Sequence, residues 1–598
     1  MKKNYKFLFL LFVLSTQFLS AQRNGQLLFQ ARLTGGNEVP AVVTKAKGLV
    51  TATVVGNEVT INGVFDSLSG PVTACHFHKG AAGKTGGTFT SFLANVRGNR
   101  IYAKVTLTNA QIGDMIEDSV YFNVHTQANG GGEIRGQMSL ETDDSFSAFA
   151  TGANEVPAIA TPATAVGSFT LSRYSGKITY NIVANGLTSA INGAHLHFGE
   201  PGRLGAVALP LTYSGNVLSG TAPYTKAVYD SLINNRLYLN IHTVNNSGGE
   251  IRGQVYYNGQ GIGFDGAING AQESPAVSTS AAGAMYANIR PNLDTLDYVI
   301  QVSGLTPIAA HFHGGVAGAS GGVLVSLPVG SVPNVYAGKV ALTPSLISGL
   351  LRDSLYVNFH TTANPNGEIR GQVTSVARIG VVSNLCGGQE TPAVATTASG
   401  AGYVSIARDR ADAVVEVVTN GLSTNANGAH IHKGAKGVAG PVVISLTSLI
   451  SGNSVSAYGT SSGIPLTLMD SIVNGLTYYN FHTTANPSGE IRGQIAADLV
   501  QECLANSTFE LNGQQVSVKI APNPASDAVT LKFESNEDMK AQVVVSDIMG
   551  RSIISKSVEI LRGVNEQNLN INNLPNGIYF VQLRSQNRIL FTEKVIKE

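Results

Sequence analysis

The sequence is poor in charge and in long apolar runs. Charged residues make up 13% of the 598, and 39 basic against 38 acidic residues leave a formal net charge of +1. A balance so close to zero gives no electrostatic reason to expect nucleic acid or an acidic membrane surface as a partner. Beyond the N-terminus no stretch stays apolar for the ~20 residues that cross a bilayer, so we expect no transmembrane helix in the mature chain.

Cysteine is scarce, with three residues. In an exported protein this number allows one disulfide and one thiol. Cys386 and Cys503 bracket one segment of the chain, a placement that suits a bridge between its ends if the geometry permits one. Cys75 precedes a histidine, but alanine stands at the equivalent position of the repeats described below. This favours a small buried residue over a metal thiolate.

Residues 1–21 have the pattern of a cleaved secretory signal. Lys2, Lys3 and Lys6 precede an apolar run that ends in small residues near Ala21. A basic start, an apolar centre and a small-residue end are typical of such signals, which the mature protein lacks. The sequence therefore predicts an exported protein.

Repetition is the main feature that the sequence does have. The stretch TACHFHKGAAG returns as NGAHLHFGEPG, IAAHFHGGVAG and NGAHIHKGAKG, with its first histidine at positions 76, 195, 311 and 430. Each copy opens with Glu-x-Pro-Ala and closes with Glu-Ile-Arg-Gly-Gln. A period of 116 to 119 residues is that of whole domains, not of a solenoid. We predict four domains, at 26–142, 143–259, 260–378 and 379–505, and a separate domain at 516–598.

Short alternating runs predict the fold class. The stretch KGLVTATVVGNEVTINGVF is rich in valine, threonine and isoleucine and is broken by glycine and asparagine, as antiparallel strands with tight turns are. Before the last hairpin, LTNAQIGDMIEDS and LTPSLISGLLRDS carry apolar residues at helical spacing. We expect an all-β protein of four tandem Greek-key sandwich or barrel domains, each with one short helix, followed by a small C-terminal β-sandwich.

All twelve histidines lie in the repeats, three in each. Side chains two residues apart on a strand share a face, so His76 and His78 project together. His125 ends a strand of the form Tyr-x-Asn-x-His, which a turn joins to the closing strand, and two strands can thus bring three imidazoles together. The predicted metal ligands are His76, His78, His125, His195, His197, His242, His311, His313, His360, His430, His432 and His482.

Three imidazoles with room for a further ligand suit zinc or copper, and iron or nickel less selectively. Histidines also cluster without metal, packed or hydrogen-bonded to a turn, and duplication alone would repeat them in every domain. The loops have diverged between the copies while no histidine has been lost or gained, which favours the metal site.

An acidic and a basic residue share a face of each closing strand, as Glu133 and Arg135 do in the first repeat. The pattern favours an ion pair that fixes the strand over a catalytic acid. The glutamate of the opening motif, Glu38, can meet the same arginine. Since no complete catalytic constellation is found, we expect no enzyme.

The motifs of each repeat suggest a family. An early Glu-x-Pro is followed by Ala-His-x-His with a glycine-rich loop, by Asn-x-His-Thr and by Gly-Glu-Ile-Arg-Gly-Gln. In these motifs the chain resembles the chordin-type domain, CHRD, over about residues 26–505. The resemblance implies an extracellular β domain; in chordin, such domains accompany modules that bind growth factors.

The His-x-His strand is also similar to the copper ligands of copper-zinc superoxide dismutase, another Greek-key protein. This likeness implies a copper or zinc oxidoreductase as an alternative. That family uses more histidines and an aspartate, and three histidines per repeat do not supply both of its metals.

The tail from about residue 516 has no histidine. The stretches VKIAPNPASDAVTLKF, VVVSDIMGRSI and LNINNLPNGIYFVQL resemble the C-terminal sorting domain of the type IX secretion system, which implies that this machinery carries the protein across an outer membrane. The sequence therefore predicts a secreted, cell-surface or extracellular binding protein with one metal ion per repeat and an unidentified ligand. A structural adhesin without metal is a further alternative.

Overall fold

The structure is a computed structural model, and it describes most of the chain. The predicted signal at residues 1–21 lies outside the described residues. No helix among the described residues is long and apolar enough to cross a membrane. The described residues are 25–259, 261–330, 332–410, 412–452, 454–460, 466–497, 503, 507–511, 514–522, 525–535, 538–547, 551–585 and 588–597.

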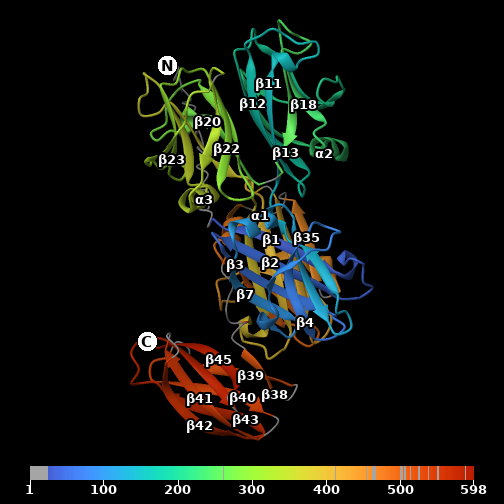
Figure 1. The fold of residues 1–598 in the computed structure, drawn as a ribbon, viewed down its shortest axis with the longest axis vertical. Coiled ribbons are helices and arrows are strands. Elements are labelled where there is room, and N and C mark those ends of the chain that lie inside the picture. Colours follow the sequence, from blue (N-terminus) through green and yellow to red (C-terminus); the bar gives the residue numbers. More distant parts are fainter. Residues whose placement is uncertain are drawn as a thin grey trace, which may run out of the picture.

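Each repeat is an antiparallel sheet that curls into a half-barrel, which confirms the predicted all-β fold (Figure 1). In the first repeat nine strands follow the order β5-β4-β8-β9-β1-β2-β3-β7-β6, so the chain crosses from one half of the sheet to the other three times, after β3, β5 and β7. The elements are β1 (Leu27–Thr34), β2 (Lys47–Val55), β3 (Glu58–Asp66), β4 (Val72–Lys79), β5 (Thr88–Ser91), β6 (Val96–Arg97), β7 (Arg100–Thr106), α1 (Asn109–Ile116), β8 (Val120–Thr126), β9 (Ile134–Gln137) and the short β10 (Ser139–Leu140), which pairs with β1.

The other three repeats repeat this order with small changes at the sheet edges. The second contains β11 (Asp144–Thr151), β12 (Thr164–Ser172), β13 (Lys177–Asn185), β14 (Ile191–Phe198), β15 (Val207–Pro210), β16 (Tyr213–Ser214), β17 (Val217–Pro223), α2 (Lys226–Ile233), β18 (Leu237–Thr243) and β19 (Ile251–Tyr257). The third contains β20 (Ile262–Asn269), β21 (Ala282–Ile289), β22 (Thr295–Ser303), β23 (Ala309–Gly314), β24 (Val323–Ser326), β25 (Val335–Ala341), α3 (Pro344–Leu351), β26 (Leu355–His360), β27 (Ile369–Gln372) and β28 (Thr374–Ser375). The fourth contains β29 (Ile379–Cys386), β30 (Ser399–Ile406), β31 (Asp412–Asn420), β32 (Ala426–Lys433), β33 (Val442–Ser445), β34 (Ile450–Ser451), β35 (Ser454–Thr460), α4 (Leu466–Val473), β36 (Thr477–Thr483) and β37 (Ile491–Ile495).

The short helix of each repeat lies where the apolar spacing predicts it. In α1, Thr108 caps the first turn: its hydroxyl accepts a hydrogen bond from the amide of Gln111, whose side chain bonds back to the cap. Such a capping box satisfies amides that the helix leaves without partners. One face of the helix, with Ile112 and Met115, is fully buried. The helix thereby closes one end of the half-barrel.

The repeats pack against one another through the outer faces of their sheets (Figure 1). Strand β2 is buried on both faces because its outer side chains meet the fourth repeat, where Leu49 and Val64 join Val382, Tyr403 and Val414 in one apolar cluster. The second and third repeats also meet sheet to sheet, through β12, β13, β21 and β22, where the buried Gln301 side chain donates a hydrogen bond of 2.9 Å to the carbonyl of Thr164. The four repeats therefore form two pairs, the first with the fourth and the second with the third.

A buried group of charges lies where these pairs meet. The guanidinium of Arg378, which is fully buried, forms ion pairs with Asp143 and Asp412. A second ion pair joins Arg408 of the fourth repeat to Asp265 of the third, 2.6 Å apart. Because buried charges depend on their partners, these contacts fix how the repeats sit together.

A disulfide joins Cys386 and Cys503, whose Cα atoms lie 5.5 Å apart, as the sequence suggested. The carbonyl of Cys503 also accepts a hydrogen bond of 2.7 Å from Arg100 of the first repeat. Cys75 is buried and unpaired, as predicted for a small core residue. The bridge thus ties the end of the fourth repeat to its start, and the Arg100 hydrogen bond holds that end against the first repeat.

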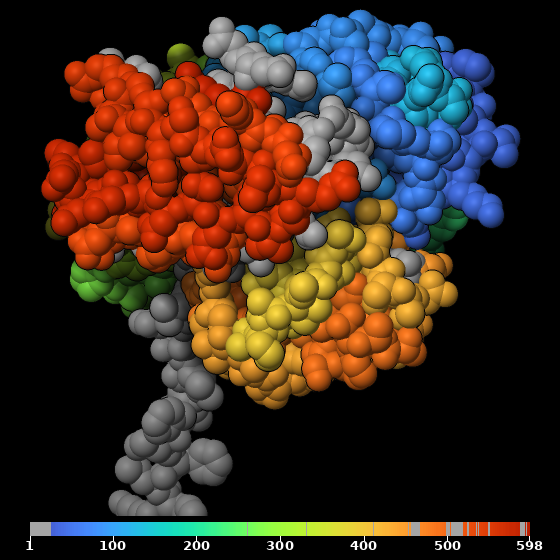
Figure 2. Space-filling model, turned by 90° about the horizontal axis from the view of Figure 1, so that it is seen from below, coloured from blue at the N-terminus to red at the C-terminus, as the bar shows by residue number. Residues whose placement is uncertain are grey.

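The C-terminal domain consists of two four-stranded sheets, and it forms one end of the molecule (Figures 1 and 2). The apolar core between the sheets includes Leu531, Val543, Val545, Val581 and Leu583. One sheet contains β38 (Ser507–Leu511), β39 (Gln514–Ala521), β40 (Ala528–Ser535) and β43 (Gly563–Asn570), and the other contains β42 (Ser552–Ile560), β41 (Met539–Asp547), β44 (Gly577–Ser585) and β45 (Arg588–Lys597).

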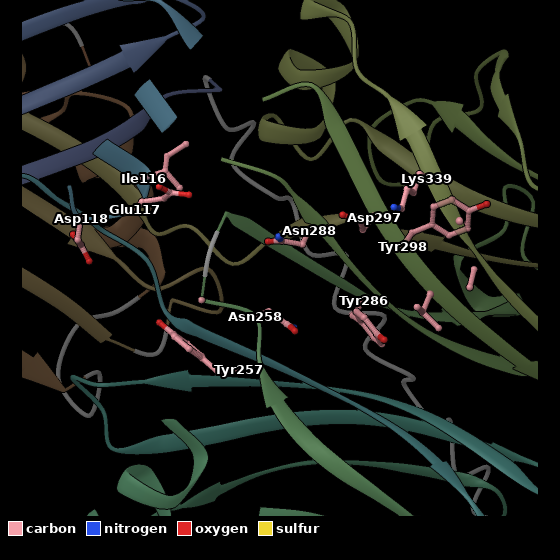
Figure 3. A pocket seen from close by; sticks show the side chains of 14 residues that line it. Ile116, Glu117, Asp118, Tyr257, Asn258, Tyr286, Asn288, Asp297, Tyr298 and Lys339 are labelled. Carbon is pink, nitrogen blue, oxygen red and sulfur yellow. The ribbon is translucent and has the colours of Figure 1, made fainter. Parts of the chain in front are cut away.

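An open cavity of about 930 Å³ lies where the first three repeats meet (Figure 3). Glu117 and Asp118 line it from the first repeat, Tyr257 from the second, and Tyr286 and Lys339 from the third. No histidine lines this cavity. It is therefore separate from the histidine clusters.

Candidate metal centre

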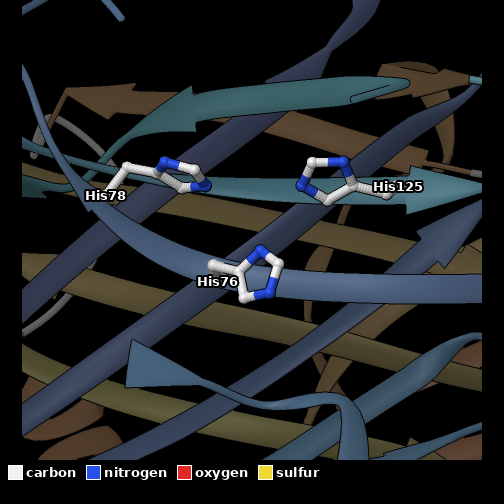
Figure 4. A group of neighbouring side chains, drawn as sticks. All are labelled: His76, His78 and His125. Carbon is white, nitrogen blue, oxygen red and sulfur yellow. The ribbon is translucent and has the colours of Figure 1, made fainter. Parts of the chain in front are cut away.

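Strands β4 and β8 bring the three histidines of the first repeat together (Figure 4). His76 lies opposite Asn123 and His125 lies opposite Ala74, so the two histidines are diagonal neighbours across the strand pair. The ring centre of His76 lies 5.6 Å from that of His78 and 5.2 Å from that of His125. As predicted, the imidazoles point toward one point in space.

Irregular pairing helps to aim these rings. The register of β4 shifts against β8 just before the histidines, and it shifts against β5 between Phe77 and His78. A bulge of this kind turns a side chain away from the direction that regular pleating gives it. The intervening Phe77 is fully buried in the half-barrel. Strand β4 is thus fixed by the side chain on its core face, and it presents the two imidazoles of His76 and His78 on its opposite face.

All four repeats build the same cluster from their predicted residues. In each, one nitrogen from every histidine lies within 4.8 Å of the other two. The clusters are His76, His78 and His125; His195, His197 and His242; His311, His313 and His360; and His430, His432 and His482.

Hydrogen bonds fix which nitrogen of each ring faces the cluster. Nδ1 of His78 lies 3.0 Å from the carbonyl oxygen of Gly86, and Nδ1 of His125 lies 3.1 Å from that of Gly130. A carbonyl can only accept, so both Nδ1 atoms carry the proton and both Nε2 atoms keep a lone pair. These Nε2 atoms and Nδ1 of His76 are buried without a hydrogen-bond partner among the described residues.

The surroundings also disfavour the charged forms of His76 and His78. Burial lowers the pKa of His76, and the neighbouring His125 and His78 lower it further. Burial also lowers the pKa of His78, although its hydrogen bond to Gly86 acts in the opposite direction. Neutral imidazoles are what a metal ion needs as ligands. Three converging lone pairs can hold one ion and leave a coordination position open.

A second layer of side chains holds His78 from behind. Its ring stacks on Tyr121 with the ring centres 4.7 Å apart, and the guanidinium of Arg135 lies 3.4 Å from the Tyr121 ring centre. Arg135 also donates to the carbonyl of Lys84, in the glycine-rich loop. In the same loop, the amide of Gly86 donates to the Tyr121 hydroxyl. This layer recurs in the other repeats, with Arg252, Arg370 and Arg492 over Tyr238, Tyr356 and Tyr478.

The predicted ion pair between Glu133 and Arg135 is wrong. Glu133 is fully buried, and its oxygens instead accept hydrogen bonds from the hydroxyls of Thr44, Ser69 and Thr126. Burial acts to raise its pKa, but these hydrogen bonds hold the pKa below its ordinary value. The carboxylate accepts hydrogen bonds from three separate segments and so links them. Arg135 instead stacks on the Tyr121 ring.

The glutamate of the opening motif, Glu38, does feel the charge of that arginine. Burial raises the pKa of Glu38 to about 7, against the opposing effects of the nearby Arg135 charge and a hydrogen bond from Asn123. The sequence did not reveal the stack of histidine, tyrosine and arginine. The signal was the constant order of Tyr-x-Asn-x-His and Glu-Ile-Arg-Gly-Gln in every repeat.

With this geometry described, known proteins can be compared. The CHRD domain matches residues 29–138, 146–255, 264–373 and 381–495. The protein belongs to the CHRD domain family. A second match, to the secretion system C-terminal sorting domain, covers residues 519–598. These matches confirm both predicted resemblances.

Two curated relatives of this CHRD protein are chordins. Chordin of Danio rerio is 31% identical over 160 residues, and chordin of Xenopus laevis is 30% identical over 158 residues. Each match covers 24% of this chain and 17% of the chordin. Among solved structures, a biofilm associated protein, BSP domain, aligns over 96% of both chains with 8% identity and a TM-score of 0.12, too low to inform on the fold.

The sorting domain indicates where this CHRD protein acts. Such a tail implies that the type IX secretion machinery handles the chain. The protein is therefore secreted to the cell surface or the extracellular space, as predicted.

Proposed function

We propose that each CHRD repeat binds one zinc or copper ion through its three histidines, and that the protein is a multivalent metal-dependent binding protein of the cell surface. The observation that carries this proposal is the set of three buried nitrogens in the first repeat that face one another without a hydrogen-bond partner among the described residues. Leaving buried polar atoms unsatisfied costs about 1–3 kcal/mol each. A bound ion would remove this cost.

The ligand type favours a transition metal, with zinc or copper as our proposal, over calcium or magnesium. Imidazole suits zinc, copper, iron and nickel, whereas calcium and magnesium prefer oxygen ligands. Hydrogen bonds from the outer nitrogens of His78 and His125 to backbone carbonyls are the outer-shell partners that metal-binding histidines usually have. We expect four ions per chain.

The open coordination position supports binding to something outside the chain. Three neutral imidazoles leave the charge of a divalent ion in place, so the site favours a carboxylate, an imidazole or another electron-pair donor from a partner. Four copies on one chain raise the effective concentration of the later contacts once the first has formed. We propose a binding role rather than an enzyme, because the three imidazoles suffice to hold an ion and the sequence motifs supply no complete catalytic constellation.

Metal analysis of the purified mature chain tests the proposal. We expect four zinc or copper ions per chain by elemental analysis after removal of excess metal. Replacing His76 and His78 by alanine should lower the number to three, because only the first cluster loses ligands. A matched control is Lys79→Ala in the same strand, which should leave four.

The outcomes separate the alternatives. Four ions without turnover of superoxide support the binding protein, whereas metal-dependent turnover supports the oxidoreductase. A chain that takes up no ion, or whose count does not change in the His76/His78 variant, contradicts the proposed sites and favours a structural adhesin.

A further inference from the structure

The fourth cluster has a hydrogen-bond partner that the other three lack. Thr447 begins the short turn after β33, and its hydroxyl oxygen lies 3.4 Å from Nε2 of His430. The same oxygen lies 3.2 Å from the amide nitrogen of Ala429 and 3.3 Å from its carbonyl oxygen. The hydroxyl is therefore held beside the outer edge of the His430 ring.

The two other rings of this cluster are fixed as in every repeat. Nδ1 of His432 lies 2.9 Å from the carbonyl oxygen of Gly440, and Nδ1 of His482 lies 3.0 Å from that of Pro487. With Thr447, each of the three rings has a protein partner on the nitrogen that faces away from the cluster. Among the described residues, the fourth repeat is the one in which each of the three rings has such a partner.

The corresponding positions in the other repeats do not supply this contact. They are identified by the backbone, because Phe92, Leu211, Leu327 and Leu446 each donate an amide hydrogen bond to the residue before the first histidine. The residues that follow them are Leu93, Thr212, Pro328 and Thr447.

Leucine and proline have no hydroxyl. The hydroxyl of Thr212 donates to the carbonyl of Ser219 at 2.8 Å and contacts the Tyr180 hydroxyl at 2.9 Å. The outer nitrogens of His76, His195 and His311 have no protein hydrogen bond in the described part of the chain.

We propose that Thr447 is a positioning residue for His430, and that it makes the fourth repeat the tightest metal site of the chain. The proposal rests on the metal binding proposed above. It predicts that the four chemically identical histidine clusters fill in sequence, with the fourth repeat first.

The reason is that a hydroxyl can serve His430 both with and without metal. Without metal, Nδ1 of His430 lies 3.0 Å from Nε2 of His482, which is an acceptor because the other nitrogen of that ring donates to Pro487. The proton of His430 therefore sits on Nδ1, and Nε2 can share the hydroxyl proton of Thr447 with the carbonyl oxygen of Ala429. When an ion takes Nδ1, the ring keeps one proton but carries it on Nε2, and the hydroxyl then accepts.

The expected size follows from the outer-shell partners of metal ligands generally. Losing such a partner weakens metal binding by about 10–100-fold. The contact here is long, and water can replace it in part, so we expect about tenfold, the lower end of that range.

The test uses the full mature chain with one intact cluster. Replacing His76, His195 and His311 by alanine leaves the fourth cluster, and zinc affinity is measured by competition with a chromophoric chelator. In this background Thr447→Val, which keeps the shape but not the hydroxyl, should weaken zinc binding about tenfold. Thr447→Ser should restore it, a rescue that a loss of packing would not give.

Two further measurements complete the test. With the second cluster as the intact one, the matched control Thr212→Val should leave zinc affinity unchanged, because that hydroxyl is engaged elsewhere. Nitrogen-15 NMR of His430 in the zinc-loaded chain should show the proton on Nε2.

The outcomes distinguish the two proposals. Failure of the single-cluster chain to bind zinc would overturn the metal site itself. Tight binding by both Thr447→Val and the parent chain would leave the metal site standing and remove the role of Thr447.

Discussion

Replacing Gly86 by alanine should damage the first metal site through the backbone. A Cβ atom on Gly86 would lie far closer than 3.0 Å to the carbonyl oxygen of Lys79, a separation that real Cβ atoms do not reach. Neither group is a flexible side chain, so the loop itself must move. Gly86 is the residue whose carbonyl oxygen holds Nδ1 of His78 at 3.0 Å.

The magnitude follows from these two contacts. Forcing extra atoms into a packed backbone costs about 1–3 kcal/mol of stability. Loss of the partner of His78 lowers metal affinity by about 10–100-fold. Because a ligand must be held to within ~0.5 Å, a loop shift that clears the overlap is enough to release the ring.

Zinc competition and thermal unfolding measure both effects. The chain carries alanine in place of His195, His311 and His430, so that the first cluster alone binds zinc. The control is Gly87→Ala in the same loop, where a Cβ would meet nothing within 4 Å. Equal zinc affinity in the Gly86→Ala and Gly87→Ala chains would refute the reasoning.

Three more predictions concern pH, the charged junction and the disulfide. Since the pKa of His76 is lowered from 6.5, zinc uptake should persist somewhat below pH 6.5 and be lost as the pH falls through the lowered value, which a titration of zinc release measures. Replacing Arg378 by methionine strands the carboxylates of Asp143 and Asp412 in the interior and should cost about 3–5 kcal/mol, measured by chemical denaturation; an unchanged midpoint would contradict the pairing. Cys503→Ser opens a loop with a sequence separation of 117 residues and should cost up to about 4–5 kcal/mol under oxidising conditions, with no change once reductant is present.

The fold and the histidine clusters could be predicted because both depend on local periodicity. Alternation places His76 and His78 on one face, and the Tyr-x-Asn-x-His strand could be paired with its neighbour through the turn before Glu133. The stack of Tyr121 and Arg135 depends on the glycine-rich loop, whose path no periodicity encodes. Sequence reasoning therefore paired Arg135 with the nearest acidic residue, whereas Glu133 meets the hydroxyls of distant loops.

The contacts between repeats could not be predicted from the sequence either. Strand β2 alternates too weakly to show that both of its faces are covered, and Leu49 could equally have faced solvent. Arg378 and Asp412 are separated by a whole strand pair, and Asp143 lies more than two hundred residues away from Arg378. Such long-range pairs are chosen by the packing of finished domains, not by local pattern.

Because the repeats pack in pairs, the protein holds its four histidine clusters at fixed relative positions, unlike a chain of domains joined by flexible linkers. Flexible tethers would let each module search for its own contact, and avidity would then decline gradually as partners were spaced differently. Here the shared interfaces around Leu49 and the buried Arg378 junction set the directions in which the four clusters face. A partner surface whose donor groups match the spacing of the four clusters would bind at several of them. A surface with a different spacing would bind at a single cluster.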